Sequence, residues 1–298
     1  MFRPILIAGP TASGKSALAL RLARVLGGHV INADALQVYD CWQVLTARPS
    51  AEEESQAPHH LYGHVGRDAA YSVGHWLRDV KAVLAAVDGP PIIIGGSGLY
   101  FFALTEGLAD IPATPAGIRK RATEATADSL RAELARTDPA TAARIDMANP
   151  VRVRRAWEVL HTTGQGLAAW HDQTPPPLVP PGAAVRAVLG TDRDWLNHRI
   201  NLRLDMMMAT GALAEVGAYV RGGWNPSAAS ARAIGAKELA RHLHGALDLS
   251  TAVHCAKIQT QKYAKRQRTW FRKRMCLWTR VNAADTDRAT ERILKSHG

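Results

Sequence analysis

The chain has 298 residues, of which 47% are hydrophobic and 21% are charged, a composition that supports a buried core and excludes intrinsic disorder as the main state. No stretch approaches the roughly 18 apolar residues that span a bilayer, and the apolar run at residues 5–8 is too short for a signal-peptide core. The 3 cysteines are scattered, which disfavours both a disulfide framework and a zinc cluster. We therefore expect a cytoplasmic protein with no membrane partner.

The charge is strongly basic, because 37 Lys and Arg stand against 26 Asp and Glu, for a net charge of +11. Much of the excess lies between residues 251 and 280, which contain 9 Lys and Arg and no acidic residue. Tyr263, Trp270, Phe271 and Trp278 are interleaved with these charges. The charges fit contacts to RNA phosphates, whereas the aromatic side chains are better explained as the core-facing side of a terminal helix.

The first third of the chain alternates short apolar strands with helices. Strands are predicted at 4–9, 29–32 and 92–94, and helices at 12–26 and 73–87. Residues 114–167 show only helical periodicity, and a proline-rich connector follows at 175–182. A strand at 185–189 and a long helix at 195–220 then return to the first pattern. This order predicts an α/β core with a parallel sheet flanked by helices, interrupted by an all-helical insertion domain.

A phosphate-binding loop joins the first strand to the first helix. Its sequence, GPTASGKS, fits the pattern GxxxxGK[ST]. Its members are Gly9, Pro10, Thr11, Ala12, Ser13, Gly14, Lys15 and Ser16. The glycines let successive N–H groups point at one anion, Lys15 neutralises phosphate charge, and the Ser16 hydroxyl can ligate Mg²⁺. The core is therefore predicted to be a P-loop core, at residues 1–112 and 183–298, with the insertion at 113–182 and basic helices at the C-terminus.

The predicted strand ends carry two further polar side chains. The strand at 92–94 runs into Gly-Gly-Ser, without the Walker-B Asp that nucleotide hydrolysis needs, whereas the strand at 29–32 leads to Asp34. Because parallel strands end at the same edge of a sheet, Asp34 and Ser97 should converge on whatever the loop binds. The alternatives are a capping or turn carboxylate for Asp34 and a turn hydroxyl for Ser97.

With these features together, the sequence resembles the tRNA dimethylallyltransferases, also called tRNA isopentenyltransferases, of the bacterial type. The resemblance rests on blocks that follow the family's order and cover nearly the whole chain. Besides the loop, they are DALQVY at 34–39, TARP at 46–49, APHH at 57–60, GGSGLY at 95–100, RRAWEV at 154–159, the segment 199–216, AIGAKEL at 233–239 and YAKRQ at 263–267. His59 and His60 are interpreted as structural or substrate-lining rather than metal ligands, because no other ligand stands at a suitable spacing.

The resemblance implies a specific reaction. A dimethylallyl group passes from dimethylallyl diphosphate to N6 of adenosine 37, 3′-adjacent to the anticodon, in tRNAs reading UNN codons, and diphosphate is released. Lys15, Asp34 and Ser97 are the implied catalytic residues, with Asp34 accepting the proton of the amine. The loop and Arg203 bind the diphosphate, and Mg²⁺ is the cofactor, with Ser16 as ligand. Arg203 follows Arg199 by four residues on one helix face, and the alternative is a solvent-exposed face paired with acidic neighbours, Asp205 or Glu215.

The resemblance also implies that the insertion binds the tRNA anticodon stem-loop. The implied RNA-binding residues are Asp34, Ala35, Leu36, Gln37, Ser97, Arg119, Val151, Arg152, Val153, Arg154 and Arg155. Ala35 stands where relatives usually have Ser, and Ser97 where many have Thr. We expect a monomer that works on tRNA and dimethylallyl diphosphate.

Three other functions stay open at this point. A metabolite kinase could use a P-loop core, but the missing Walker-B acid and the basic tail argue against it. An enzyme that prenylates free adenine nucleotides would not need the insertion. An RNA-binding module would leave the phosphate loop without a use.

Overall fold

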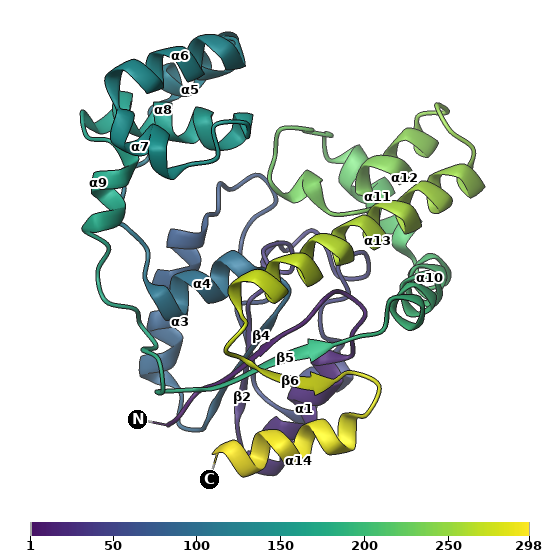
Figure 1. The fold of residues 1–298 in the computed structure, drawn as a ribbon. Helices are drawn as coiled ribbons and strands as arrows, with labels where there is room; N and C mark the ends of the chain where they lie inside the picture. The colour runs from purple at the N-terminus through teal and green to yellow at the C-terminus, as the bar shows by residue number, and fades with distance from the viewer. Residues whose placement is uncertain (1, 298) are drawn as a thin grey trace. The chain divides into compact units, whose positions relative to one another are not determined.

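The computed structural model describes residues 2–297, within which the chain forms a six-stranded parallel sheet with the order β3-β2-β4-β1-β5-β6. The strands are β1 (Ile5–Ala8), β2 (His29–Asn32), β3 (His59–His60), β4 (Pro91–Gly95), β5 (Val185–Gly190) and β6 (Thr279–Asn282). β1 and β4 lie in the middle and are buried along their whole length, which explains why their sequences are apolar on both faces. The prediction of a parallel sheet flanked by helices is confirmed (Figure 1).

Helices cover both faces of this sheet (Figure 1). The helices of this part of the chain are α1 (Lys15–Leu26), α2 (Ala51–Gln56), α3 (Val73–Ala86), α4 (Gly98–Glu106), α10 (Arg193–Ala209), α11 (Ala212–Arg221), α12 (Ala236–Leu243), α13 (Leu249–Arg274) and α14 (Thr286–His297), with a 3-10 turn at Ser230–Arg232. α1 and α14 pack together against one face, where Leu22 and Ile293 join the strand side chains in one core. α3 and α4 lie side by side through Trp76 and Tyr100, whose stacked rings are 4.5 Å apart.

A second apolar cluster supports the segment that follows β2. Trp42 stacks on Tyr219 of α11 at 4.6 Å, and its indole N–H donates to the Ser230 carbonyl at 2.9 Å. The Glu215 carboxylate accepts hydrogen bonds from the backbone N–H groups of residues 43–45, between 2.5 and 3.0 Å. Residues 38–45 are therefore held on α11 and α12, next to the ends of the strands.

The structure differs from the predicted elements in three places. α1 begins at Lys15 rather than at residue 12, because Ala12 and Gly14 adopt positive φ angles that a helix does not allow. The predicted helix at 195–220 is wrong as a single element, since Thr210 and Gly211 (φ +111°) divide it into α10 and α11. The two edge strands, β3 and β6, have no counterpart among the predicted elements, because neither is long or regularly alternating in sequence.

Residues 106–178 form a second compact unit, while residues 1–105 and 179–298 form the first. The second unit consists of α5 (Ala116–Glu124), α6 (Ala127–Thr137), α7 (Pro139–Arg144), α8 (Pro150–Thr163) and α9 (Leu167–Asp172). Leu130, Leu134, Val153 and Trp157 are central to its own hydrophobic core. Among residues 2–297, no helix is long and apolar enough to cross a membrane.

Candidate active site

The phosphate-binding loop is closed by its own backbone and by the neighbouring strand. The Gly9 N–H donates to the Gly95 carbonyl at 3.2 Å, and the Ser13 N–H donates to the Pro10 carbonyl at 3.3 Å. Ala12 and Gly14 both have left-handed backbone angles, φ +62° and +85°. When left-handed residues alternate with right-handed ones, successive N–H groups point toward the concave side of the loop. This makes an anion-binding nest at the start of α1.

Lys15 is the cation of this loop. Its ammonium donates to the Pro10 carbonyl at 3.3 Å, so the side chain folds back over the loop. Burial lowers the pKa of Lys15 from 10.5 to about 8; the nearby Asp34 carboxylate opposes this shift and the Arg203 guanidinium adds to it. A cation destabilised by burial gains free energy when an anion binds beside it, and the loop is therefore suited to a phosphate or diphosphate.

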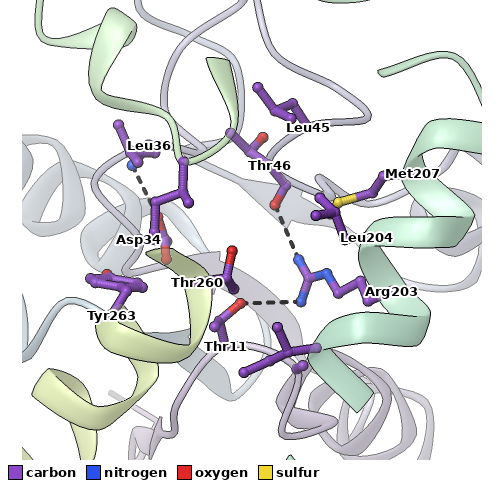
Figure 2. Close-up of a pocket in the computed structure, with 13 residues that line it drawn as sticks. Thr11, Asp34, Leu36, Leu45, Thr46, Arg203, Leu204, Met207, Thr260 and Tyr263 are labelled. Atoms are coloured by element: carbon purple, nitrogen blue, oxygen red, sulfur yellow. Dashed lines mark hydrogen bonds between the residues drawn. The ribbon is translucent and has the colours of Figure 1, made fainter. Parts of the chain in front are cut away.

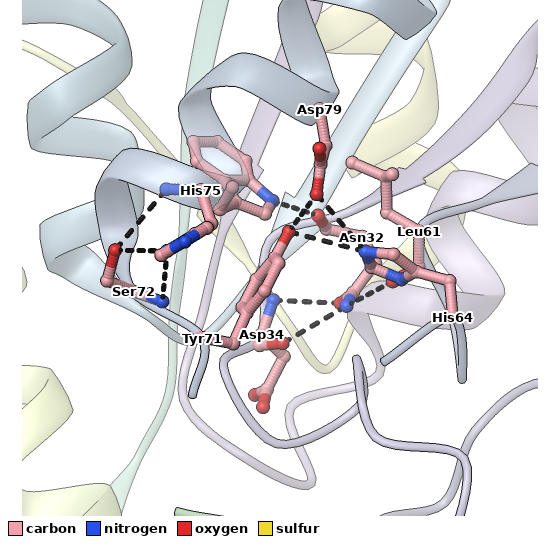
Figure 3. Close-up of polar contacts among 9 residues, drawn as sticks. Asn32, Asp34, Leu61, His64, Tyr71, Ser72, His75 and Asp79 are labelled. Carbon is pink, nitrogen blue, oxygen red and sulfur yellow. Dashed lines mark hydrogen bonds and ion pairs between the residues drawn. The ribbon is translucent and has the colours of Figure 1, made fainter. Parts of the chain in front are cut away.

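Asp34 lies at the end of β2, fixed by the buried side chain of Asn32 (Figure 3). The Asn32 amide oxygen accepts from the Asp34 N–H at 2.8 Å, and its NH₂ group donates to the carbonyls of Asp34 (3.0 Å) and Leu61 (2.9 Å). Asp34 Oδ1 accepts from the Leu36 N–H at 3.0 Å. One carboxylate oxygen thus has a turn-stabilising role, and Oδ2 makes no hydrogen bond within residues 2–297.

Ser97 follows β4 and lies beside the segment that carries Asp34. Its hydroxyl oxygen accepts from the Ala35 N–H at 2.9 Å, and its backbone N–H donates to the Ala33 carbonyl at 3.2 Å. The structure thus brings Ser97 to the segment that follows β2, as the parallel arrangement predicts. The hydroxyl hydrogen of Ser97 has no acceptor among the described residues and is available to a bound molecule.

Two arginines of α10 reach the same loop. Arg199 Nε donates to the Ala12 carbonyl at 2.9 Å. Arg203 donates to the Thr11 hydroxyl at 3.5 Å and to the Thr46 carbonyl at 3.4 Å (Figure 2). Burial lowers the pKa of Arg203, while Asp34 raises it and Arg199 lowers it further. A solvent-exposed pairing of Arg203 with an acidic residue of its own helix is therefore excluded, because the side chain is half-buried and its guanidinium bonds to Thr11 and Thr46.

The acidic neighbours of these arginines are occupied elsewhere. Asp205 pairs with Lys257 at 2.6 Å. Glu215 binds the backbone of residues 43–45. The two guanidiniums therefore remain directed at the loop rather than at acidic side chains of their own helix.

A pocket opens over this polar floor (Figure 2). It contains about 620 Å³, its open mouth included. Thr11, Asp34 and Arg203 are polar groups on its lining, and Tyr263 and Thr260 of α13 form one side. The remaining wall is largely apolar and consists of Ala12, Leu36, Leu45, Ile200, Leu204, Met207 and Ile234, together with Thr46. The pocket thus combines an anion-binding end with space for a short hydrocarbon chain.

Gln267 of α13 belongs to the block YAKRQ at 263–267 but is absent from the predicted site residues. Its side-chain oxygen accepts from the Thr11 N–H at 2.9 Å, and its NH₂ group donates to the Gly96 carbonyl at 3.0 Å. The side chain is 5% exposed. One amide therefore joins the phosphate-binding loop to the end of β4, and its place in the block YAKRQ is the signal that could have included it in the predicted site.

Three tyrosines lie within reach of the charge of Asp34 and are also absent from the predicted site. Burial, followed by the charge of Asp34, raises the pKa of Tyr62, Tyr100 and Tyr263 above the ordinary value. The phenols are therefore neutral near pH 7 and can act only as neutral hydrogen-bonding groups. They come from three separate parts of the chain, so only the fold reveals that they belong to one site.

The segment after Asp34 is held in place by side chain to backbone bonds. The Gln37 NH₂ group donates to the carbonyls of Thr46 and Ala47, at 2.9 and 2.8 Å. Both of its N–H donors are therefore used, and only its oxygen is available to a ligand. Ala35 and Leu36 are half-buried beside it, with their N–H groups bound to Ser97 and Asp34.

The residues predicted to bind RNA in the helical unit have different environments. Arg119, Val151, Arg152 and Arg154 are exposed. Arg155 donates to the Thr114 hydroxyl at 3.0 Å. Val153 is 1% exposed and packs in the core of the unit, because it lies on the core-facing side of α8, rotated by about 100° from both Arg152 and Arg154. The Val153 side chain is therefore part of the core of the unit, and tRNA binding by this residue stays a prediction.

The side chains near the phosphate-binding loop fit a magnesium ion that takes few ligands from the protein and most of its ligands from a bound phosphate and water. Within residues 2–297, no group of three or more His, Cys, Asp or Glu could hold a metal by itself. His59 instead bonds to the Ala57 carbonyl at 2.8 Å, and His60 Nε2 lies 3.0 Å from His29 Nδ1. The Ser16 hydroxyl is exposed in the first turn of α1. Mg²⁺ typically takes few protein ligands and completes its shell with phosphate oxygens and water, which this arrangement allows.

Two family models match the chain, and the one that matches most of it agrees with the similar proteins. A family described as IPP transferase matches residues 37–274, and one described as isopentenyl transferase matches residues 3–62. The chain is 58% identical over 281 residues to the tRNA dimethylallyltransferase of Cereibacter sphaeroides strain KD131, covering 94% of this chain and 88% of that protein. It is 56% identical over 280 residues to the enzyme of Ruegeria sp. strain TM1040, covering 94% and 96%.

Solved structures agree with these relatives. The tRNA isopentenylpyrophosphate transferase of Bacillus halodurans is 30% identical, with a TM-score of 0.71, and the match covers 100% of this chain and 95% of that one. A eukaryotic dimethylallyltransferase acting on tRNA shares the fold, with a TM-score of 0.84 at 24% identity over 98% of this chain and 78% of that one. The resemblance stated from the motifs is thereby confirmed, and the chain belongs to the IPP transferase family, that of the tRNA dimethylallyltransferases.

Proposed function

We propose that this protein transfers a dimethylallyl group from dimethylallyl diphosphate to N6 of the adenosine 3′-adjacent to the anticodon, position 37, in tRNAs reading UNN codons. The observation that carries the proposal is the pocket itself. Its lining includes Thr11 and Ala12 of the phosphate-binding loop, Arg203 and Asp34, its wall is apolar, and Lys15 of the same loop feels the charges of both Asp34 and Arg203. A diphosphate ester of a five-carbon chain fits this combination, and a nucleoside triphosphate does not need the apolar wall.

The first half of the reaction is departure of diphosphate. The bond between C1 of the allyl group and the bridging oxygen breaks, and its electron pair stays on the diphosphate. The N–H groups of the loop, the ammonium of Lys15 and the guanidinium of Arg203 stabilise the negative charge that develops there. Bound Mg²⁺, with Ser16 as its protein ligand, would supply further neutralisation of the leaving group.

The second half is attack by the amine of adenine. The nitrogen forms a bond to C1 and loses a proton, and the free Oδ2 of Asp34 is the acceptor that the pocket offers. Asp34 Oδ1 stays bound to the Leu36 N–H, so the carboxylate keeps its orientation while Oδ2 takes the proton. Ser97, whose hydroxyl oxygen is bound to the Ala35 N–H next to Asp34, can donate its hydroxyl hydrogen to a bound molecule. The base has to leave its stack in the anticodon loop to reach this depth.

The helical unit is proposed to bind the anticodon stem-loop. Its exposed Arg119, Arg152 and Arg154 supply positive charge for phosphate contacts. The protein is also proposed to act as a monomer, as expected from the sequence. A tRNA substrate accords with the cytoplasmic location expected from the sequence.

The experiment is a transfer assay with two acceptors. The purified protein is incubated with Mg²⁺, radiolabelled dimethylallyl diphosphate, and either an unmodified anticodon stem-loop reading a UNN codon or AMP. We expect label in the stem-loop, and none when the target adenosine is replaced by guanosine. Label only in AMP would contradict the proposal in favour of a free-nucleotide prenyltransferase. Absence of label from both acceptors, with folded protein, would contradict any prenyl transfer.

A further inference from the structure

The apolar wall of the substrate pocket has two ends, which belong to different hydrophobic clusters. Ala12 of the phosphate-binding loop and Ile200 of α10 lie in one cluster. Leu45 lies in another, and Leu36 and Met207 pack against that cluster. Because Ala12 belongs to the loop, the first pair adjoins the anion-binding end of the pocket. Leu36, Leu45 and Met207 form the opposite end, which we call the distal wall.

One face of α10 leads from the loop to the distal wall. Ile200, Arg203 and Met207 line the pocket at spacings of three and four residues, which places their side chains on one face of the helix. The guanidinium of Arg203 marks the anion-binding end, since it donates to the Thr11 hydroxyl at 3.5 Å. Met207 comes one turn later, about 6 Å further along the helix at about 1.5 Å per residue. Figure 2 shows Met207 and Leu45 on the side of Arg203 that is away from Thr11.

This spacing matches the length of a five-carbon chain. From C1 to its branched end, a dimethylallyl group spans three carbon–carbon bonds, about 4 Å when each bond is about 1.5 Å long. A geranyl group, with ten carbons, spans seven such bonds, about 9 Å, which exceeds the roughly 6 Å between the turns of Arg203 and Met207. The longer chain would therefore meet the distal wall before its C1 reaches the position for reaction.

The distal wall is backed by the core and has little room to yield. Leu45 is 6% exposed, and its Cδ1 lies 3.2 Å from the position that a Cβ on Gly235 would occupy. The Glu215 carboxylate also fixes the backbone of Leu45, by accepting its N–H at 2.8 Å. Met207 is half-buried and fills the space in front of this support. The open mouth is no alternative for a longer chain, because the adenine has to enter there to reach Asp34.

We propose that Met207, supported by Leu45, limits the prenyl donor to five carbons. The inference rests on the proposed function, whose donor it specifies by length. Without the methionine side chain, a geranyl donor reacts by the same step. The bond from C1 to the bridging oxygen breaks and leaves its electron pair on diphosphate, N6 of adenine bonds to C1, and the proton of the amine passes to Asp34.

The test shortens Met207 in steps and compares it with its neighbour. Met207→Val and Met207→Ala remove increasing volume, whereas Met207→Leu nearly conserves it. Met206→Ala is the matched control, since Met206 is 66% exposed and lies outside the pocket lining. The measured quantity is kcat/KM for geranyl diphosphate divided by kcat/KM for dimethylallyl diphosphate, with the anticodon stem-loop as acceptor. Calorimetry gives the affinities for the unreactive thiolodiphosphate analogues of both donors, and circular dichroism checks folding.

We expect the wild-type protein to favour dimethylallyl diphosphate. In Met207→Ala the geranyl-to-dimethylallyl ratio should rise by about 10- to 200-fold, the range by which one methylene discriminates in an apolar pocket. The rise should be smaller in Met207→Val, and the ratio should stay near the wild-type value in Met207→Leu and Met206→Ala.

Three results would overturn the inference while transfer of the dimethylallyl group is normal. They are a wild-type protein that uses both donors equally, an unchanged ratio in folded Met207→Ala and Met207→Val, and an equal rise in Met206→Ala. If the protein transfers neither group, the proposed function is refuted and the analogues decide the inference. A rise of the affinity ratio in Met207→Ala would then uphold the length limit, and an unchanged affinity ratio would overturn it as well.

Discussion

The bond between Gln267 and the phosphate-binding loop leads to a prediction about both stability and substrate affinity. Gln267→Leu keeps a side chain of similar length but removes both hydrogen bonds, leaving the Thr11 N–H and the Gly96 carbonyl without partners at a buried site. A buried polar group left unsatisfied costs about 1–3 kcal/mol, so two such groups cost about 2–6 kcal/mol. Because Thr11 belongs to the loop, KM for dimethylallyl diphosphate should rise as well.

The matched control is Gln261→Leu, on the same helix. Gln261 makes one bond to the Asn201 side chain at 3.1 Å and is half-buried, so its replacement should cost about 0.5–1.5 kcal/mol. Urea unfolding gives the two stabilities, and hydrogen exchange of the Thr11 amide reports the bond itself. We expect exchange at Thr11 to accelerate in Gln267→Leu only. A loss of stability no larger than that of the control, with Thr11 still protected, would refute the reasoning.

Three other predictions concern the pocket and its frame. Asp34→Asn should lower the single-turnover rate by about 10²- to 10⁴-fold, because an amide cannot take the proton of the amine. Binding of tRNA should change little, because the amide oxygen can still accept the hydrogen bond from the Leu36 N–H. A parallel loss of tRNA affinity would show that the carboxylate binds RNA rather than taking the proton. Burial lowers the pKa of Lys15 to about 8, so affinity for inorganic diphosphate, measured by calorimetry, should fall by up to about ten-fold per pH unit above that value. In Lys15→Arg the affinity should not change near pH 8. A change in affinity that persists there in this variant would assign the titration to another group. Gly98→Ala places a Cβ 2.1 Å from the Trp270 indole nitrogen, so it should destabilise the protein by about 1–3 kcal/mol and change the tryptophan fluorescence; an unchanged unfolding midpoint and spectrum would contradict this packing.

Much of the core could be predicted from local sequence because its signals are local. The phosphate-binding loop needs glycine, lysine and serine at fixed spacing between a strand and a helix, and it occurs in that context here. The run of three isoleucines predicts β4, since a strand buried on both faces has no polar positions. The edge strands lack such a signal, and β3 has only two residues, which become a strand by pairing with β2.

The candidate site was predictable only in part. Asp34 and Ser97 could be placed together because parallel strands end at one edge of the sheet. The sequence could not show that Val153 turns into the core of the helical unit, although it lies between residues that are exposed. Helical periodicity is visible there, but which face is buried depends on the neighbouring helices α5 and α6.

The sequence by itself determined the family, the parallel core with its helical insertion and the anion-binding loop, because these depend on residue types at short spacings and on the order of blocks along the chain. The tertiary structure decided what surrounds the loop. Gln267, Tyr62 and Tyr263 are remote from Thr11 and Asp34 in sequence, and they meet at one site because the sheet and α13 bring them there. Burial and the fields of neighbouring charges, which set the pKa of Lys15, exist only once the chain has excluded water from that site.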